Sequence, residues 1–158
     1  MKFKIIPLSL GFVEKVKTEK IDSFGNPVIR QLATGHGPCR LSLRPFVPGE
    51  DYRLLFSHSP FKKRNAFDQS GPIFIQDKEV AAYSDVHNFP KEIKADSINF
   101  PLSLIGYNEN QEMVSTQLVG DKDIDELINE VFETNFEIDF LHARNAEACC
   151  FICKIERC

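Results

Sequence analysis

With 158 residues, 42% of them hydrophobic and 27% charged, the chain has the composition of one ordinary globular domain, residues 1–158. Its formal net charge of −4 argues against nucleic acid and anionic membranes as partners. No stretch reaches the roughly 18 apolar residues of a membrane-spanning helix, and the apolar run after Lys4 lacks the cleavage site of a signal peptide. Because five cysteines, an odd number, also fit a reducing compartment, we expect a cytoplasmic protein.

The first third of the chain predicts two strands around a helix, at Lys2–Ile6, Leu10–Glu19 and Val28–Leu32. Two alternating runs follow, from Cys39 to Pro45 and from Tyr52 to His58, and the glycine and proline residues between them favour a turn. We expect these two runs to pair as a hairpin.

The register of this hairpin decides whether it carries a site. Matching the apolar faces places Cys39 opposite His58 and Arg44 opposite Arg53. Opposed side chains on one face of a sheet hold their Cβ atoms about 5 Å apart. A shift of two residues would keep the same faces and separate Cys39 from His58, so this alternative stays open.

The rest of the chain alternates strands with irregular links and one clear helix. Further strands are predicted at Pro72–Gln76, Pro101–Tyr107, Met113–Val119, Phe136–His142 and Cys150–Glu156. The helix begins at a cap, Asp121 or Asp123, and its acidic Asp125, Glu126 and Glu130 are expected on a solvated face. Strands and helices do not alternate along the chain as they do in βαβ units. We therefore expect an α+β fold: a mainly antiparallel sheet, open or barrel-like, with one principal helix (about 121–134) packed on it.

Metal and redox chemistry have little support from the spacing of cysteines. Cys150 and Cys153 form a C-x-x-C pattern, but residues three apart on a strand point to opposite faces. A metal held by Cys39, His58 and His142 is an alternative without any local ligand spacing. We therefore expect no cofactor and no metal.

One group of polar residues is predicted to meet where strands end. His58 and His142 each close an apolar strand face, and strand ends that run into loops are common places for a pocket. A thiol such as Cys39 beside an imidazole can act as a nucleophile, with Asn145 to orient the imidazole. The structural alternative is that Cys39 is a small buried hydrophobe and both histidines are core residues.

Several segments have a characteristic order and spacing: Gly37-Pro38-Cys39-Arg40-Leu41-Ser42-Leu43, Pro48-Gly49-Glu50, Leu54-Leu55 with His58, Ser70-Gly71-Pro72-Ile73-Phe74, and Leu141-His142-Ala143-Arg144-Asn145-Ala146 through Cys150-Phe151. They resemble the domain of unknown function 1203 family, and the resemblance runs from residue 37 to the C-terminus. It implies a shared fold and site, but no reaction. The family pattern contains the equivalents of Cys39, Arg40, His58, Ser70, Gly71, His142 and Asn145.

The chain also departs from that pattern. The family commonly has a second histidine where Arg144 stands, and an arginine near the position of Asp68. The first departure would remove a metal ligand and leaves an anion-binding role for Arg144 open.

Two functions follow from these residues. The favoured one is binding of a small anionic or polar molecule in a pocket formed by Cys39, Arg40, His58, His142, Arg144 and Asn145, with Ser70 and Gly71 at its rim. The alternative is a thiol-dependent transferase or hydrolase with Cys39 as nucleophile and a histidine as base. Whether the protein is an enzyme, and its oligomeric state, are not determined by the sequence.

Overall fold

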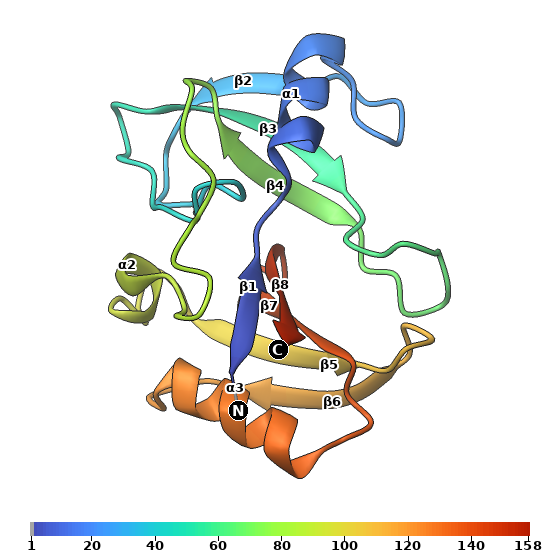
Figure 1. Cartoon of the computed structure of the whole chain (residues 1–158). Coiled ribbons are helices and arrows are strands. Elements are labelled where there is room, and N and C mark those ends of the chain that lie inside the picture. Colours follow the sequence, from blue (N-terminus) through green and yellow to red (C-terminus); the bar gives the residue numbers. More distant parts are fainter. Residues whose placement is uncertain (1) are drawn as a thin grey trace.

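The computed structural model describes residues 2–158 and contains two antiparallel sheets (Figure 1). The larger sheet consists of β1 (Phe3–Ile6), β8 (Phe151–Arg157), β7 (Phe140–Asn145), β5 (Leu102–Tyr107) and β6 (Met113–Leu118), in that order. The smaller sheet consists of β2 (Ile29–Leu32), β3 (Tyr52–His58) and β4 (Gly71–Gln76). The predicted α+β class with mainly antiparallel strands is confirmed, and the strands do not close into a barrel.

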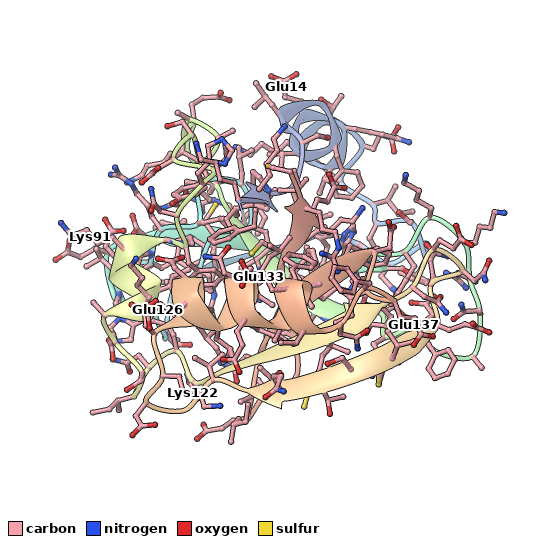
Figure 2. The ribbon with its side chains drawn as sticks, turned by 60° about the horizontal axis from the view of Figure 1, so that its bottom comes forward. Glu14, Lys91, Lys122, Glu126, Glu133 and Glu137 are labelled. Carbon is pink, nitrogen blue, oxygen red and sulfur yellow. The ribbon has the colours of Figure 1, made fainter. Side chains whose placement is uncertain are left out.

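Each sheet carries a helix and has its own apolar core. Helix α1 (Leu10–Glu19) packs on the smaller sheet, and α3 (Ile124–Thr134) lies along the larger one (Figure 2). The apolar stripe of α3 is buried, as its periodicity predicts: Ile124, Leu127, Ile128, Val131 and Phe132. Phe151 of β8 packs in the core of the smaller sheet, so β8 joins the two halves.

Both long helices begin at a side-chain cap, and the cap of α3 is one of the two predicted residues. The Ser9 hydroxyl accepts a hydrogen bond from the Phe12 amide at the start of α1. The Asp123 carboxylate accepts one from the Glu126 amide at the start of α3. A third helix, α2 (Lys91–Lys94), is a single short turn. No helix within residues 2–158 is long and apolar enough to cross a bilayer.

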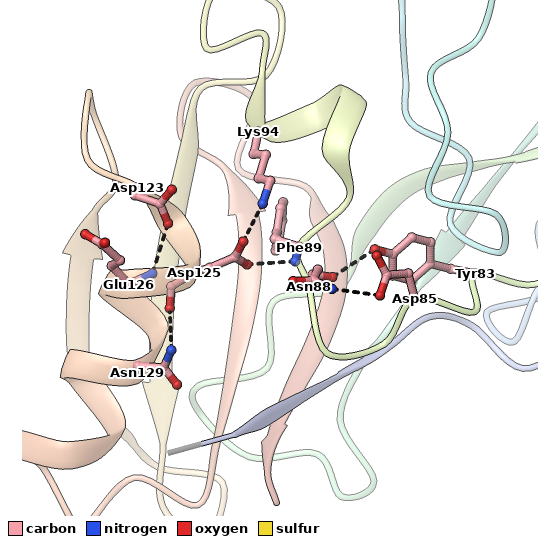
Figure 3. A network of polar contacts seen from close by, with 9 residues as sticks. All are labelled: Tyr83, Asp85, Asn88, Phe89, Lys94, Asp123, Asp125, Glu126 and Asn129. Atoms are coloured by element: carbon pink, nitrogen blue, oxygen red, sulfur yellow. Dashed lines mark hydrogen bonds and ion pairs between the residues drawn. The ribbon is translucent and has the colours of Figure 1, made fainter.

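One acidic residue of α3 does not belong to a solvated face. Asp125 is half-buried, accepts a hydrogen bond from the Phe89 amide (2.7 Å) and forms an ion pair with Lys94 (Figure 3). It therefore anchors the segment around α2 to the helix. Glu126 and Glu130 are exposed, as expected. The sequence could not show this difference, because the partners of Asp125 are more than thirty residues away.

The predicted hairpin of Cys39–Pro45 with Tyr52–His58 is wrong. β3 pairs with β2 over Tyr52–Leu55 and with β4 over Arg53–His58, and residues 39–45 do not pair with it. Residues 39–45 instead fold back on themselves, with hydrogen bonds from Leu43 N to Cys39 O (2.9 Å) and from Cys39 N to Arg44 O (3.0 Å). Cys39 therefore does not oppose His58.

The proposed pairing of Arg44 with Arg53 falls with the hairpin. Arg53 opposes Gln31 on β2 and Gln76 on β4, and its guanidinium donates to the Gln31 side chain while lying over the Phe74 ring. The other expected strands form within a few residues of their predicted bounds. The largest difference is β7, which begins at Phe140 rather than at residue 136.

Candidate functional site

A cavity of roughly 370 Å³ lies between the end of the β3–β4 pair and the turn that joins β7 to β8. We call it the His58 cavity. The residues of its lining that matter below are His58, Ser70, Gly71, Arg144, Cys149 and Cys150. Since His58 pairs with Gly71 in the sheet, the end of β3 and the start of β4 reach the same rim. The structure thus brings together four of the predicted site residues: His58, Ser70, Gly71 and Arg144.

The other side of the cavity is a tight turn built by Asn145. Its side-chain oxygen accepts hydrogen bonds from the amides of Glu147 (2.8 Å) and Ala148 (2.7 Å). Its backbone amide bonds to the carbonyl of Cys150. The side chain of Asn145 is thereby engaged in the turn and shapes the wall that carries Cys149 and Cys150.

Cys39 lies outside the His58 cavity. Its side chain is 1% exposed, and its Sγ accepts a hydrogen bond from the Gln76 amide at the far end of β4. His58 pairs with Gly71, five residues along that strand, which corresponds to about 15 Å. The two residues expected to form a nucleophile and its base are therefore well separated.

The thiol at the cavity is Cys150, and it contacts Arg40. The half-buried Cys150 Sγ accepts a hydrogen bond from Arg40 Nη2 (3.3 Å). The remaining hydrogen bonds of this guanidinium go to the backbone carbonyls of Phe151 (2.6 Å) and Pro38. Arg40 is 1% exposed, and no carboxylate within residues 2–158 pairs with it in an ion pair. It lies behind the wall of the cavity, where burial lowers its pKa and Cys150 acts in the opposite direction.

Arg144 is the second buried guanidinium, and it lines the cavity directly. It is 3% exposed and follows an irregularity in the β7–β8 pairing. Nη1 donates to the Cys149 carbonyl (3.1 Å), whereas Nε and Nη2 have no hydrogen-bond partner in the described part of the chain. Tyr107 lies close to Arg144, outside the geometry of a good hydrogen bond. Burial raises the pKa of Tyr107, and the positive charge of Arg144 counteracts that shift.

His58 is kept neutral by its surroundings. Burial and the positive charge of Arg40 lower its pKa to about 4, while Asp68 acts in the opposite direction. Its imidazole packs on the rings of Phe12 and Phe151. A neutral ring at the edge of the cavity can offer one donor and one acceptor to a ligand.

His142 is close to His58 but is sealed from the cavity. Its ring is 0% exposed and sits among the rings of Phe61, Tyr107, Phe140 and Phe151. Neither ring nitrogen has a hydrogen-bond partner among residues 2–158. Burial, followed by the charges of Arg144, Lys154 and His58, lowers its pKa to about 2. Positive side chains therefore act on both histidines in addition to burial.

The long connection Ser59–Gly71 is attached to the turn between β5 and β6. The side chain of Gln111, in the turn between β5 and β6, accepts hydrogen bonds from the Lys62 and Lys63 amides and donates to the Lys63 carbonyl. This attachment holds Phe61 against His142.

Within residues 2–158, no three histidine, cysteine or acidic side chains are grouped so that they could hold a metal.

Cys150 is a site residue that local sequence patterns do not single out. The C-x-x-C pattern that contains it does not describe its position. Its partner in the pattern, Cys153, is 0% exposed in the core of the larger sheet, and burial raises its pKa to about 12. The sequence feature that could have identified Cys150 is its position between the turn built by Asn145 and the start of β8.

A family model described as "Protein of unknown function (DUF1203)" matches residues 36–157. The chain belongs to the DUF1203 family. The matched segment contains the complete His58 cavity and Arg40, whereas β1, α1 and β2 lie outside it. Comparisons with curated proteins and with solved structures found no significant match. Any activity of this DUF1203 protein must therefore be argued from the cavity itself.

Proposed function

We propose that this DUF1203 protein binds a small anion in the His58 cavity. The observation that carries the proposal is the state of Arg144. Arg144 is almost fully buried and lines the cavity, and two nitrogens of its guanidinium have no hydrogen-bond partner in the described residues. A buried charge is costly unless it is paired and hydrogen-bonded, and a bound anion would supply both.

The charges around the cavity support the same proposal. Arg144 and Arg40 both lack a carboxylate in an ion pair among residues 2–158. Burial, and after it this positive charge, lowers the pKa values of the two histidines, to about 4 for His58 and about 2 for His142. An anion would balance a site in which positive charge is now in excess.

The shape and chemistry of the lining favour a carboxylate or a phosphate group. The planar guanidinium of Arg144 can donate two parallel hydrogen bonds to either group. Ser70 provides a hydroxyl and His58 a ring nitrogen on the opposite wall. A cavity of roughly 370 Å³ is at the small end of ordinary ligand sites, so the ligand is a small molecule.

The test compares two arginines by isothermal titration calorimetry with inorganic phosphate and with succinate. Arg144→Met is expected to weaken binding of the preferred anion at least about tenfold, because a charged hydrogen-bond donor is lost. The matched control is Arg30→Met, since Arg30 is exposed and paired with Asp77 away from the cavity. The control should bind as the wild type does.

A second readout reports the place of binding. An anion near His58 should raise the pKa of its imidazole from about 4, because it stabilises the charged ring. The imidazole signals of His58, followed by NMR against pH with and without phosphate, would show this. The proposal would be overturned if Arg144→Met bound both anions as tightly as the wild type, or if the wild type bound neither at millimolar concentration.

The alternative of a thiol enzyme based on Cys39 has no support from the geometry. Cys39 is buried, accepts a backbone hydrogen bond, and lies at the opposite end of β4 from His58. A nucleophile must be reachable by substrate and within reach of its base.

A further inference from the structure

Cys150 combines three features that no other cysteine of the chain shares. It lines the His58 cavity, it is half-buried, and its sulfur accepts a hydrogen bond from a guanidinium, that of Arg40. Cys39 and Cys153 are buried in the two cores. Cys149 also lines the cavity, but it is exposed, and its sulfur contacts only the carbonyl of Glu147.

The contact with Arg40 places a positive charge beside the sulfur of Cys150. The nucleophile in cysteine chemistry is the thiolate, and a nearby positive charge stabilises it. Arg40 gives its other hydrogen bonds to backbone carbonyls, which are neutral. The sulfur of Cys150 is therefore the group at hydrogen-bond distance from Arg40 that can carry a compensating negative charge. Arg144 remains free to hold an anionic reactant.

The properties of His58 select the class of reaction. Acyl transfer needs a base with a pKa near the working pH to move protons during the reaction. The imidazole of His58 has a pKa of about 4 and is a poor base at neutral pH. Thiol–disulfide exchange needs a thiolate and an accessible disulfide, without a general base.

We propose that Cys150 is the reactive thiol of the cavity and exchanges with a small disulfide that carries carboxylates, oriented by Arg144. The inference rests on the proposed anion-binding function, because the carboxylate is what brings the disulfide to Cys150. The thiolate of Cys150 attacks one sulfur of the disulfide, a new S–S bond forms, and the second sulfur leaves as a thiolate. One disulfide is consumed and one is formed, so no further oxidant is required.

The product is a mixed disulfide that Cys153 cannot resolve. Cys153, three residues away, is 0% exposed and belongs to the core of the larger sheet, so its thiol cannot reach the adduct without unfolding β8. Release of Cys150 requires an external thiol or the exposed Cys149, which lines the same cavity. The cavity is accordingly a site of reversible thiolation.

The experiment uses two disulfides that release a coloured thiol. One is 5,5′-dithiobis(2-nitrobenzoate), which carries two carboxylates, and the other is 4,4′-dithiodipyridine, which is neutral at pH 7.5. The protein carries Cys149→Ser and Cys158→Ser, because these two exposed thiols would otherwise react as well. Peptide mass spectrometry identifies the labelled cysteine.

Cys150 should react first with both reagents, and Cys150→Ser should abolish the fast phase. Arg144→Met should slow the dianionic reagent at least about tenfold and the neutral reagent less than about twofold. Phosphate should compete with the dianionic reagent only. Equal slowing of both reagents in Arg144→Met, or faster labelling at Cys39 or Cys153, would overturn the inference.

Failure of this inference can be separated from failure of the proposed function. Cys150→Ser should bind phosphate as tightly as the wild type, since the charge on Arg144 is retained. If phosphate binding depends on Arg144 while Cys150 stays as unreactive as a buried thiol, the exchange reaction is wrong and anion binding stands. If Arg144→Met changes neither phosphate binding nor labelling, both are wrong.

Discussion

The loop around Cys39 and the turn before Cys150 both present a thiol close to Arg40, yet they are built in opposite ways. Around Cys39 the backbone closes its own hydrogen bonds, and the Gln76 amide bonds to the sulfur. Around Cys150 the structure leaves an opening, and it leaves Nε and Nη2 of Arg144 without partners in the described residues. We interpret the closed backbone hydrogen bonds around Cys39 as support for the fold, and the unpaired buried charge beside the cavity is the basis of the proposed anion binding.

The largest expected effect is a loss of stability in acid, and it tests the region around His58 and His142. The folded chain holds His58 at a pKa of about 4 and His142 at about 2, against an ordinary value near 6.5. Between pH 6.5 and these lower values the unfolded chain binds more protons than the folded chain does. The contribution of the two histidines to the free energy of unfolding is therefore fully present above pH 6.5 and is lost as the pH decreases. Each histidine contributes about 1.4 kcal/mol per pH unit, so for the two together a fall of two units should cost on the order of 5 kcal/mol.

Urea unfolding at pH 7.5, 5.5 and 4.5 measures this slope. His142→Phe should reduce the slope by about half, because the ring then carries no titrating group. It should not lower the stability at pH 7.5, since both ring nitrogens of His142 lack a partner among residues 2–158. An unchanged slope in His142→Phe would contradict the assignment.

The second effect tests the close packing of the Cys39 region. Gly37 has φ +84°, and a Cβ added there would lie 2.3 Å from the Phe46 ring. Phe46 is itself buried, so Gly37→Ala should lower the free energy of unfolding by about 2–4 kcal/mol through backbone strain and displacement of the ring.

Gly49→Ala is the matched control for this substitution. Gly49 has a similar φ of +79° but open space where the Cβ would be, so only the backbone strain of about 1 kcal/mol is expected. Chemical denaturation of both variants separates strain from packing. Equal losses in the two variants would show that the Phe46 contact is unimportant.

The smallest effect compares the two thiols directly. Cys39→Ser should cost about 1–2 kcal/mol, because a hydroxyl replaces an apolar sulfur in the core of the smaller sheet. Cys150→Ser should change the stability by less than about 0.5 kcal/mol, since its site is half-buried and open to the cavity. Thermal unfolding of both variants, at pH 7.5 without added anions, makes the comparison. A greater loss for Cys150→Ser would reverse the roles assigned to the two regions.

Local patterns were sufficient for much of the fold. The bounds of α1, the cap and buried stripe of α3, and the β5–β6 hairpin all follow from periodicity, capping and turn chemistry over neighbouring residues. The ends of β3 and β4 are also sequence-determined, which is why His58, Ser70 and Gly71 were expected at one rim. These features depend on interactions between residues close in the chain.

The site required the tertiary structure, because its decisive contacts join distant segments. The pairing of β3 with β2 and β4 excluded the Cys39 strand, and only that pairing separates Cys39 from His58. Arg40 meets Cys150 across 110 residues, and His142 is enclosed by Phe61 from a loop some eighty residues earlier. Alternation along a strand shows on which face of the sheet a side chain lies, but not which other strand lies next to it. The sequence by itself therefore determined the elements and the candidate polar residues, and the packing of the two sheets decided which of those residues share a cavity.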